Sequence, residues 1–301
     1  MTDPPDTALA DRLLPWFALH ARDLPWRGVE VTGWGVLVSE IMLQQTPVVR
    51  VEPVWHVWMT RWPRPSDLAA APTAEVLRAW GKLGYPRRAL RLQAAAAVVA
   101  AEHGDVVPPD VDTLLALPGI GTYTARAVAA FAYRRRCPVV DTNVRRVVAR
   151  AVHGRAEAGD TSSRDLPDTE ALLPLDEAAA ARTSAALMEL GATVCVARGP
   201  RCADCPVLDV CAWQHAGRPA HDGPIRRGQR WAGTDRQVRG RLLDVLRDAP
   251  GPVEAPALEA AWLTDPAQRA RCLDSLLVDG LVEQLADGRF ALPGETLDAS
   301  S

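Results

Sequence analysis

Four of the six cysteines in this 301-residue chain follow the spacing C-x6-C-x2-C-x5-C. They are Cys195, Cys202, Cys205 and Cys211. Four thiolates with no histidine among them suit a metal site or an iron–sulfur cluster. Zinc is the chemical alternative, since four thiolates also complete its tetrahedral coordination. The other two, Cys137 and Cys272, stand apart, and we interpret both as core cysteines.

A second feature is the glycine-rich turn Leu117–Gly121, with the sequence LPGIG. Gly119 and Gly121 permit positive φ angles and keep side chains out of a tight turn. The turn precedes a helix expected from Thr122, whose first backbone N–H groups and dipole suit a phosphate. The alternative is a plain connection between two helices.

Asp141 follows an apolar pair and precedes another expected helix, which starts near Asn143. The simplest role for this side chain is to cap that helix. An acid at a helix start is also well placed to stay ionised and to face a developing positive charge. The pattern alone leaves both roles open.

The elements that must position these residues are helices, because strand-like alternation is nearly absent before residue 280. Expected helices cover 7–20, 33–45, 87–102, 111–117, 122–131, 143–152 and 176–190. Thr46 and Pro47 predict an N-cap followed by proline at the first helical position. Residues 154–170 are expected to form a polar loop.

The composition excludes several classes of protein. Hydrophobic residues make up 48% and charged residues 24%, as in ordinary globular chains. The acidic, proline-rich start does not resemble a signal peptide. The apolar run 94–101 is far shorter than the ~20 residues of a membrane span. Six cysteines are too few for a disulfide scaffold, which favours a reducing, intracellular location.

The formal net charge of −3 hides an uneven distribution. Residues 78–150 hold twelve Arg/Lys against five Asp/Glu, whereas residues 252–301 hold three Arg against nine Asp/Glu. The basic stretch suits either solvated helix faces or a surface that faces phosphates. Lys82 is the only lysine in the chain.

Together, the LPGIG turn, Asp141 and the cysteine spacing resemble the endonuclease III superfamily of DNA base-excision glycosylases. Within it, several segments are similar to the adenine DNA glycosylase (MutY) family, in an actinobacterial form, and the similarity runs from about residue 7 to 215. These segments are Leu24–Arg27 (LPWR), Ser39–Thr46 (SEIMLQQT), Gly84–Tyr85 and Met188–Ala192 (MELGA).

The resemblance implies an all-α, helix–hairpin–helix fold with two lobes. A helical barrel would cover residues 27–135, and residues 1–26 with 136–215 would form a lobe in which the four cysteines hold one [4Fe–4S] cluster. The catalytic cleft would lie between the lobes.

The chain departs from the family after residue 215. The family usually carries a Nudix-type domain that reads 8-oxoguanine, and this chain is too short for one. Residues 216–235 are instead expected to form a linker. Residues 236–293 predict three helices and a hairpin at Asp287–Gly288, which suggests a small winged-helix-like domain. Its acidic charge favours packing or a protein partner over strong DNA binding.

The resemblance also implies catalytic roles. Glu40 corresponds to the acid and base that protonates adenine and then handles water, and Asp141 to the carboxylate that stabilises the oxocarbenium-like sugar. The chemistry agrees, because adenine is a poor anionic leaving group and needs a protonated acid in a dry pocket. Tyr123 stands where strand-cleaving relatives have lysine, so efficient lysine-based lyase activity is not expected.

Further residues gain roles from the same resemblance. Trp26, Arg27 and Glu189 would surround the flipped adenine. DNA binding and insertion into the base stack would involve Leu43, Gln44, Gln45, Gly119, Gly121, Asn143, Arg198 and Arg201.

We therefore predict a monofunctional glycosylase that excises adenine opposite 8-oxoguanine or guanine in double-stranded DNA. We expect a cytoplasmic, nucleoid-associated monomer with no membrane contact, and a possible protein partner for the acidic C-terminal domain. The alternatives are a thymine or uracil mismatch glycosylase on the same scaffold, a non-catalytic cluster protein that senses DNA damage, and a zinc-bound structural module.

Overall fold

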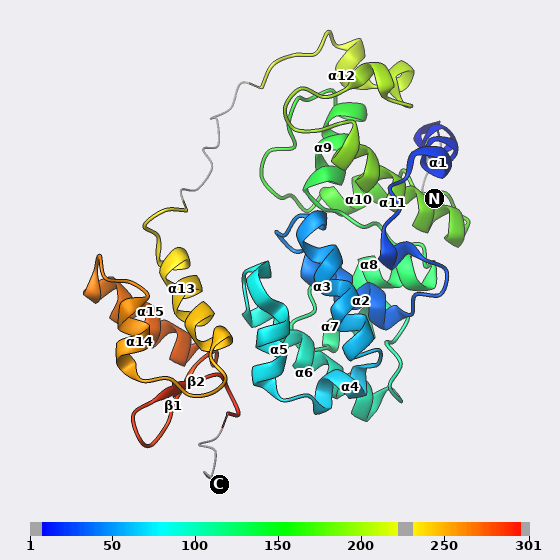
Figure 1. Cartoon of the computed structure of the whole chain (residues 1–301). Coiled ribbons are helices and arrows are strands. Elements are labelled where there is room, and N and C mark those ends of the chain that lie inside the picture. Colours follow the sequence, from blue (N-terminus) through cyan, green and yellow to red (C-terminus); the bar gives the residue numbers. More distant parts are fainter. Residues whose placement is uncertain (1–7, 222–230, 296–301) are drawn as a thin grey trace. The chain divides into compact units, whose positions relative to one another are not determined.

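The computed structural model describes residues 8–221 and 231–295 (Figure 1). The predicted linker 216–235 therefore falls partly outside the described residues. The chain divides into two compact units. The first unit comprises Met1–Glu40, Pro108–Ala116 and Ile120–Ile225, and the second comprises Ile41–Val107, Leu117–Gly119 and Arg226–Ser301.

The first unit is built around the long helix α11, against which α1 and α9 pack (Figure 1). Its core contains Leu13 of α1, Val147 of α9 and Leu187 and Leu190 of α11, joined by Trp213 of α12. The elements of this unit are α1 (Ala8–His20), η1 (Pro25–Arg27), most of α2 (Gly33–Leu43), α7 (Val111–Ala116), α8 (Thr122–Tyr133), α9 (Thr142–Ala151), α10 (Asp165–Glu170), α11 (Glu177–Thr193), η3 (Cys202–Asp204), η4 (Leu208–Val210) and α12 (Ala212–His215).

The second unit packs α6 against α4 and α5, around a cluster of tryptophans. The Trp58 ring meets Trp62 and Trp80 edge-on, with ring centroids 4.9 and 5.5 Å apart, which is a favourable aromatic geometry. Its elements are α3 (Val48–Arg61), α4 (Pro65–Ala70), α5 (Thr73–Trp80), η2 (Gly81–Leu83), α6 (Arg87–Glu102), α13 (Asp235–Asp248), α14 (Ala255–Ala260), α15 (Pro266–Val278), β1 (Glu283–Gln284) and β2 (Phe290–Ala291).

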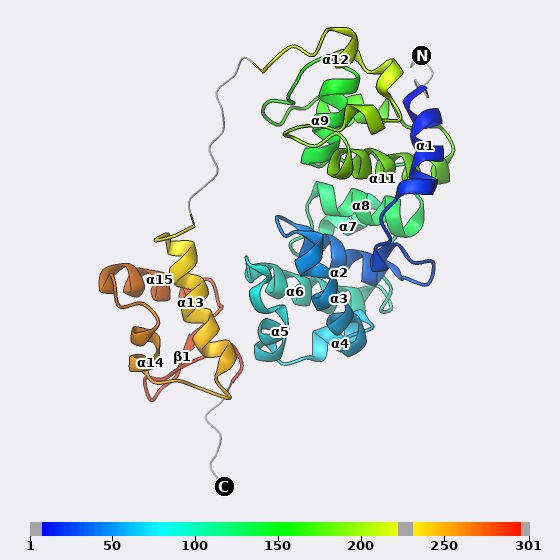
Figure 2. The same cartoon turned by 45° about the horizontal axis from the view of Figure 1, so that its top comes forward.

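The C-terminal part of the second unit has the three helices and the hairpin expected from the sequence (Figure 2). Strands β1 and β2 pair antiparallel, and Val253 adds a bridge to Phe290. Helix α13 contacts α5 through reciprocal bonds. Arg78 Nη2 donates to Ala249 O at 3.0 Å, and Arg247 Nε donates to Leu77 O at 3.1 Å.

Two sequence expectations about local structure are wrong. The segment 154–170 is not loop throughout, because α10 occupies Asp165–Glu170. Thr46 is not an N-cap, because α3 starts at Val48 with Pro47 at its N-cap position. The Thr46 side chain is buried and bonds elsewhere, to Leu83 O at 3.1 Å.

Every helix in the described residues is too short or too polar to cross a membrane.

Candidate functional site

Glu40 is a buried carboxyl group near the end of α2. It is 5% exposed, and its Oε2 has no hydrogen-bond partner in the described residues. Burial raises the pKa of Glu40 to about 7, and the Asp141 charge acts in the same direction, whereas a hydrogen bond with Tyr123 and the Arg27 charge partly oppose the rise. A buried acid with a free oxygen and a pKa near neutrality can act as a general acid and then as a base.

Asp141 lies at the start of α9 as its N-cap. Its Oδ1 accepts from the backbone N–H groups of Asn143 and Val144 at 2.8 and 2.7 Å, and its Oδ2 accepts from Asn143 Nδ2 at 2.7 Å. These three donors fix the orientation of the carboxylate at the start of the helix. The capping role is therefore present, and it is compatible with a catalytic role because the side chain remains partly exposed.

Tyr123 is in the first turn of α8 and hydrogen-bonds to Glu40. Burial and the nearby negative charges of Glu40 and Asp141 raise the pKa of Tyr123 well above its ordinary value, so the hydroxyl keeps its proton. Glu40, Tyr123 and Asp141 thus form one electrostatic group within the first unit.

Glu189 of α11 is fully buried but fully partnered. Arg22 Nε donates to its Oε1 at 2.6 Å, and Arg22 Nη2 and Arg27 Nη2 donate to its Oε2 at 3.0 and 2.9 Å. Burial would raise the pKa of Glu189, but the two arginines together lower it below its ordinary value. Arg27 connects this ion pair to Glu40 electrostatically, and the neighbouring Trp26 is buried in η1. The sequence pattern around Arg22 gives no sign of this contact.

The residues predicted to enter DNA lie at the end of α2 and just beyond it, at the start of the second unit. Leu43 and Gln44 are half-buried, and Gln45 is exposed. In the LPGIG turn, only Gly119 uses a positive φ, of 75°, and an added Cβ there would lie 2.7 Å from Arg91 Cβ. Gly121 has an extended backbone and open space beside it, so it does not use the positive φ that glycine permits.

The four cysteines of the C-x6-C-x2-C-x5-C segment line one cavity in the first unit, together with Arg150 and Trp213. Arg150 is 4% exposed, donates to Cys195 Sγ at 3.4 Å and lies over the Trp213 ring at 4.9 Å. No group of three or more His, Cys, Asp or Glu in the described part of the chain is placed to hold a single metal ion. The shared cavity and the all-sulfur donors fit an iron–sulfur cluster, in which each thiolate binds a different iron.

Arg146 connects the Asp141 carboxylate to the cysteine segment, and the sequence pattern does not predict this. Its Nη2 donates to Asn143 Oδ1 at 2.7 Å, and its Nε donates to Cys195 O at 2.7 Å. Close approach of α9 and α11 depends on Gly191, where an added Cβ would lie 2.7 Å from Asn143 O. The Asn143 side chain is thus held within the protein, and its DNA contact stays a prediction.

Arg198 and Arg201 are both exposed between the first two cysteines of the segment. The Arg201 side chain donates to Thr193 O. Their positions leave them available to a ligand in solution.

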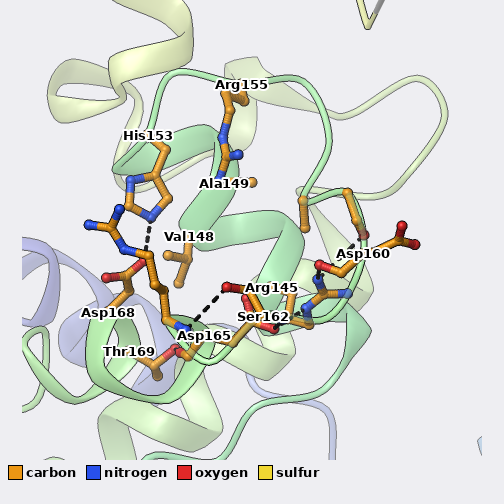
Figure 3. A pocket seen from close by; sticks show the side chains of 13 residues that line it. Arg145, Val148, Ala149, His153, Arg155, Asp160, Ser162, Asp165, Asp168 and Thr169 are labelled. Atoms are coloured by element: carbon orange, nitrogen blue, oxygen red, sulfur yellow. Dashed lines mark hydrogen bonds and ion pairs between the residues drawn. The ribbon is translucent and has the colours of Figure 1, made fainter. Parts of the chain in front are cut away.

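A cavity of about 430 Å³ lies away from these residues, between α9, α10 and the loop that joins them (Figure 3). Two of its acidic side chains pair with basic side chains of the lining. Arg145 Nε lies 2.8 Å from Asp165 Oδ2, and His153 Nε2 lies 2.9 Å from Asp168 Oδ2. The residues predicted for chemistry do not line it, so we do not assign the candidate site to this cavity.

Comparison with known proteins gives one family match and two closely similar proteins for this sequence. Residues 38–165 match the family described as HhH-GPD superfamily base excision DNA repair protein. The chain is 65% identical to a protein named adenine DNA glycosylase from Mycobacterium tuberculosis, over 94% of this chain and 93% of that protein. It is 66% identical to the protein of the same name from Mycolicibacterium smegmatis, over 94% of this chain and 95% of that protein.

Among solved structures, a thermostable thymine-DNA glycosylase is similar in fold, with a TM-score of 0.62 and 26% sequence identity. The match covers 69% of this chain and 95% of that chain. The mostly helical, helix–hairpin–helix fold expected from the sequence is confirmed by these matches.

Proposed function

The chain belongs to the adenine DNA glycosylase family, and on that premise we propose that it is a monofunctional enzyme that removes adenine opposite 8-oxoguanine or guanine in double-stranded DNA. The observation that carries the proposal is the buried Glu40, whose Oε2 is unpartnered and whose pKa is raised to about 7 beside Asp141. These are the requirements of acid-assisted cleavage of an N-glycosidic bond.

In the proposed reaction, Glu40 gives its proton to the departing adenine, because the base leaves poorly as an anion. The C–N bond then breaks, its electron pair goes to the base, and positive charge develops on the sugar. Asp141 faces that charge as a carboxylate held by three hydrogen-bond donors. Glu40, now ionised, accepts a proton from the water that adds to the sugar.

The base pocket is proposed to include Trp26, Arg27 and Glu189. Because both oxygens of Glu189 are engaged by arginines, its main contribution is to hold Arg27 in place. Arg27 in turn places a positive charge near Glu40. The arrangement supports a pocket whose walls are fixed before the base enters it.

The DNA surface is proposed to include Leu43, Gln44 and Gln45 as the inserted residues, and Gly119, Gly121 and Asn143 near the backbone. The exposed Arg198 and Arg201 would contact phosphates. Filling the gap left by the flipped base offsets part of the cost of unstacking.

Cys195, Cys202, Cys205 and Cys211 are proposed to hold one [4Fe–4S] cluster. When bound, the cluster would cross-link the segment that carries Arg198 and Arg201. Iron and sulfide analysis with visible absorbance tests the assignment, and zinc without iron would overturn it. We further propose a cytoplasmic, nucleoid-associated monomer, and a protein partner for the acidic C-terminal domain.

One experiment tests the function directly. The protein is incubated with duplexes that contain A:8-oxoG, A:G, T:G or U:G, and abasic products are then cleaved with alkali. We expect cleavage at the two adenine mismatches. Because the fold also resembles a thymine-DNA glycosylase, cleavage only at T:G or U:G would replace the adenine assignment with that alternative.

A further inference from the structure

Arg88 carries a buried guanidinium that binds main-chain oxygens at the end of α2. It is the second residue of α6 and is 7% exposed. Its Nη1 donates to the carbonyl oxygens of Ile41, Met42 and Gln44 at 2.7, 2.9 and 2.7 Å. The last carbonyl groups of a helix have no donor within the helix. A single side chain from another helix therefore completes the end of α2.

The same guanidinium also binds residues outside α2 and so connects two turns. Its Nη2 donates to Thr46 Oγ1 at 3.0 Å and to Gly84 O at 2.9 Å. Thr46 Oγ1 itself donates to Leu83 O at 3.1 Å. Residues 44–46 are thus attached to residues 83–84, and Arg88 is the centre of the attachment.

The turn that Arg88 holds has an uncommon backbone conformation. Gln45 has a φ of 56°, in the left-handed region that residues other than glycine seldom adopt. Such a conformation persists only where the surroundings over-determine it. The neighbouring Thr46 is buried, whereas Gln45 is exposed. The turn is therefore fixed from inside while it presents Gln45 to solvent.

The charge of Arg88 is balanced by dipoles. Within the described residues no carboxylate forms an ion pair with it, and the carbonyl groups at the negative end of α2 are its main partners. Burial lowers the pKa of Arg88 to about 10, with Tyr85 acting in the opposite direction, so it is charged at neutral pH. Lysine would keep the charge, but its single ammonium lacks the planar fork that reaches both turns.

We propose that Arg88 is the positioning residue of the DNA-inserting turn, which it holds in the inserting conformation before DNA binds. The turn then enters the base stack without a large loss of conformational freedom on binding. This inference rests on the proposed function, because the insertion of residues 43–45 into DNA is part of that proposal. Arg88 itself touches no reacting atom in this scheme.

The test compares Arg88→Lys with wild type on two single-turnover substrates. One has adenine opposite 8-oxoguanine, and the other has adenine opposite an abasic analogue, where no base pair must be broken. We expect a loss of roughly 10- to 100-fold on the first substrate, as for a displaced element near a reacting centre. On the second substrate the loss should stay within about threefold, because an unpaired base costs less to extrude.

Arg136→Lys is the matched control, since Arg136 also binds carbonyl oxygens, those of Pro174 and Leu173 at 2.9 and 3.3 Å. It should excise adenine like wild type. Amide hydrogen exchange supplies a second readout, and it should increase at residues 43–46 in Arg88→Lys only. Thr46→Val removes one acceptor of the Arg88 guanidinium. It should also lower excision opposite 8-oxoguanine and raise exchange at residues 43–46, but by less than Arg88→Lys does.

Equal losses on both substrates, or unchanged exchange at residues 43–46, would overturn the positioning role. If Arg88→Lys does not fold, Thr46→Val decides by the same comparison. A wild-type protein that removes no adenine would refute the proposed function, and the exchange of residues 43–46 would still decide whether Arg88 holds the turn.

Discussion

Glu40 and Glu189 are two buried glutamates whose pKa values shift in opposite directions. The Glu40 carboxyl has a tyrosine hydroxyl as its hydrogen-bond partner, and its pKa rises to about 7. Glu189 is bound by Arg22 and Arg27, and its pKa falls. Burial raises the pKa of both carboxyl groups, but only Glu189 is bound by two arginines, so Glu40 can be a proton donor while Glu189 is a fixed anion.

The raised pKa of Glu40 predicts the pH dependence of base release. Because the acid form does the work, the single-turnover excision rate should fall as pH rises through about 7. Glu40→Gln should abolish base release and keep DNA binding at every pH. Substantial turnover by Glu40→Gln would contradict the role of this carboxyl group.

The same shift predicts a stability difference that can be measured without DNA. The pKa of Glu40 rises from the ordinary 4.5 to about 7 in the folded protein, so protonated Glu40 favours folding. That stabilisation is complete below pH 4.5 and is lost as pH rises through about 7. Measured by urea unfolding, the free energy of unfolding of wild type should fall by about 3 kcal/mol relative to that of Glu40→Gln as pH rises across this range. If the unfolding free energies of wild type and Glu40→Gln changed in parallel with pH, the pKa of Glu40 would not be raised in the folded protein.

The absence of lyase chemistry is a third prediction at this scale. A Schiff base needs an amine, and Tyr123 provides only a hydroxyl. Lys82 is highly exposed and lies 4.0 Å from Asp244. Borohydride treatment during turnover should trap no stoichiometric DNA adduct, and Lys82→Arg should excise adenine like wild type. A trapped peptide that contains Lys82 would show that this lysine forms a Schiff base with DNA.

At the residue scale, the sequence predicts the groups proposed for catalysis better than it predicts the groups that hold them in place. Glu40, Asp141 and Tyr123 lie in recognisable segments, and they form one electrostatic group in the structure. Arg22 and Arg88 could not be predicted, because their partners are main-chain or side-chain oxygens far away in the sequence. Local patterns carry no signal for such contacts, which depend on how helices pack.

At the scale of elements, Asp141 both caps α9 and takes part in the proposed catalysis. Asp141→Asn keeps an oxygen that can cap the helix, so its unfolding free energy should stay within about 0.5 kcal/mol of wild type. Asp141→Ala should lose about 1 to 2 kcal/mol. Both variants should lose base release, because neither has a carboxylate. Urea unfolding and single-turnover excision provide the two measurements.

Asp176 provides the control for this comparison. It caps α11 through a bond from Ala179 N to its Oδ1 at 2.8 Å, and it takes no part in the proposed reaction. Asp176→Ala should therefore cost a similar stability and leave base release intact. If Asp176→Ala lost base release as fully as Asp141→Asn does, the loss would reflect helix stability and not the Asp141 charge.

Element boundaries were predictable where a helix has both a clear apolar face and a clear stop. The expected bounds 87–102 agree with α6. The sequence pattern does not predict the short α10, because six residues that include a proline give little periodic signal. The Thr-Pro pattern predicts the wrong role for Thr46, because it does not reveal that the Thr46 hydroxyl contacts Leu83.

At the scale of the whole molecule, part of the positive charge of the basic stretch 78–150 is neutralised by carboxylates of the acidic end 252–301. Within the second unit, Arg87 pairs with Asp279 at 3.1 Å, and Arg78 pairs with Glu295. Part of the excess positive charge therefore stabilises the docking of the C-terminal helices. The charge left for DNA must come from arginines that have no such partner among the described residues, and Arg198 in the cysteine segment is an exposed example.

This distribution predicts how DNA affinity depends on salt. Each phosphate contact contributes about −0.9 to the slope of log K against log salt concentration. Arg198→Ala and Arg201→Ala should each make the slope shallower by about that amount, and the double variant by about twice as much. Affinity should fall similarly for matched and mismatched duplexes, because phosphate contacts carry no sequence information. Arg271→Ala removes the same charge from the C-terminal helices, where Arg271 pairs with Asp235 at 3.0 Å, and should leave the slope unchanged. If all three arginines changed the slope equally, net charge rather than a defined phosphate surface would control binding.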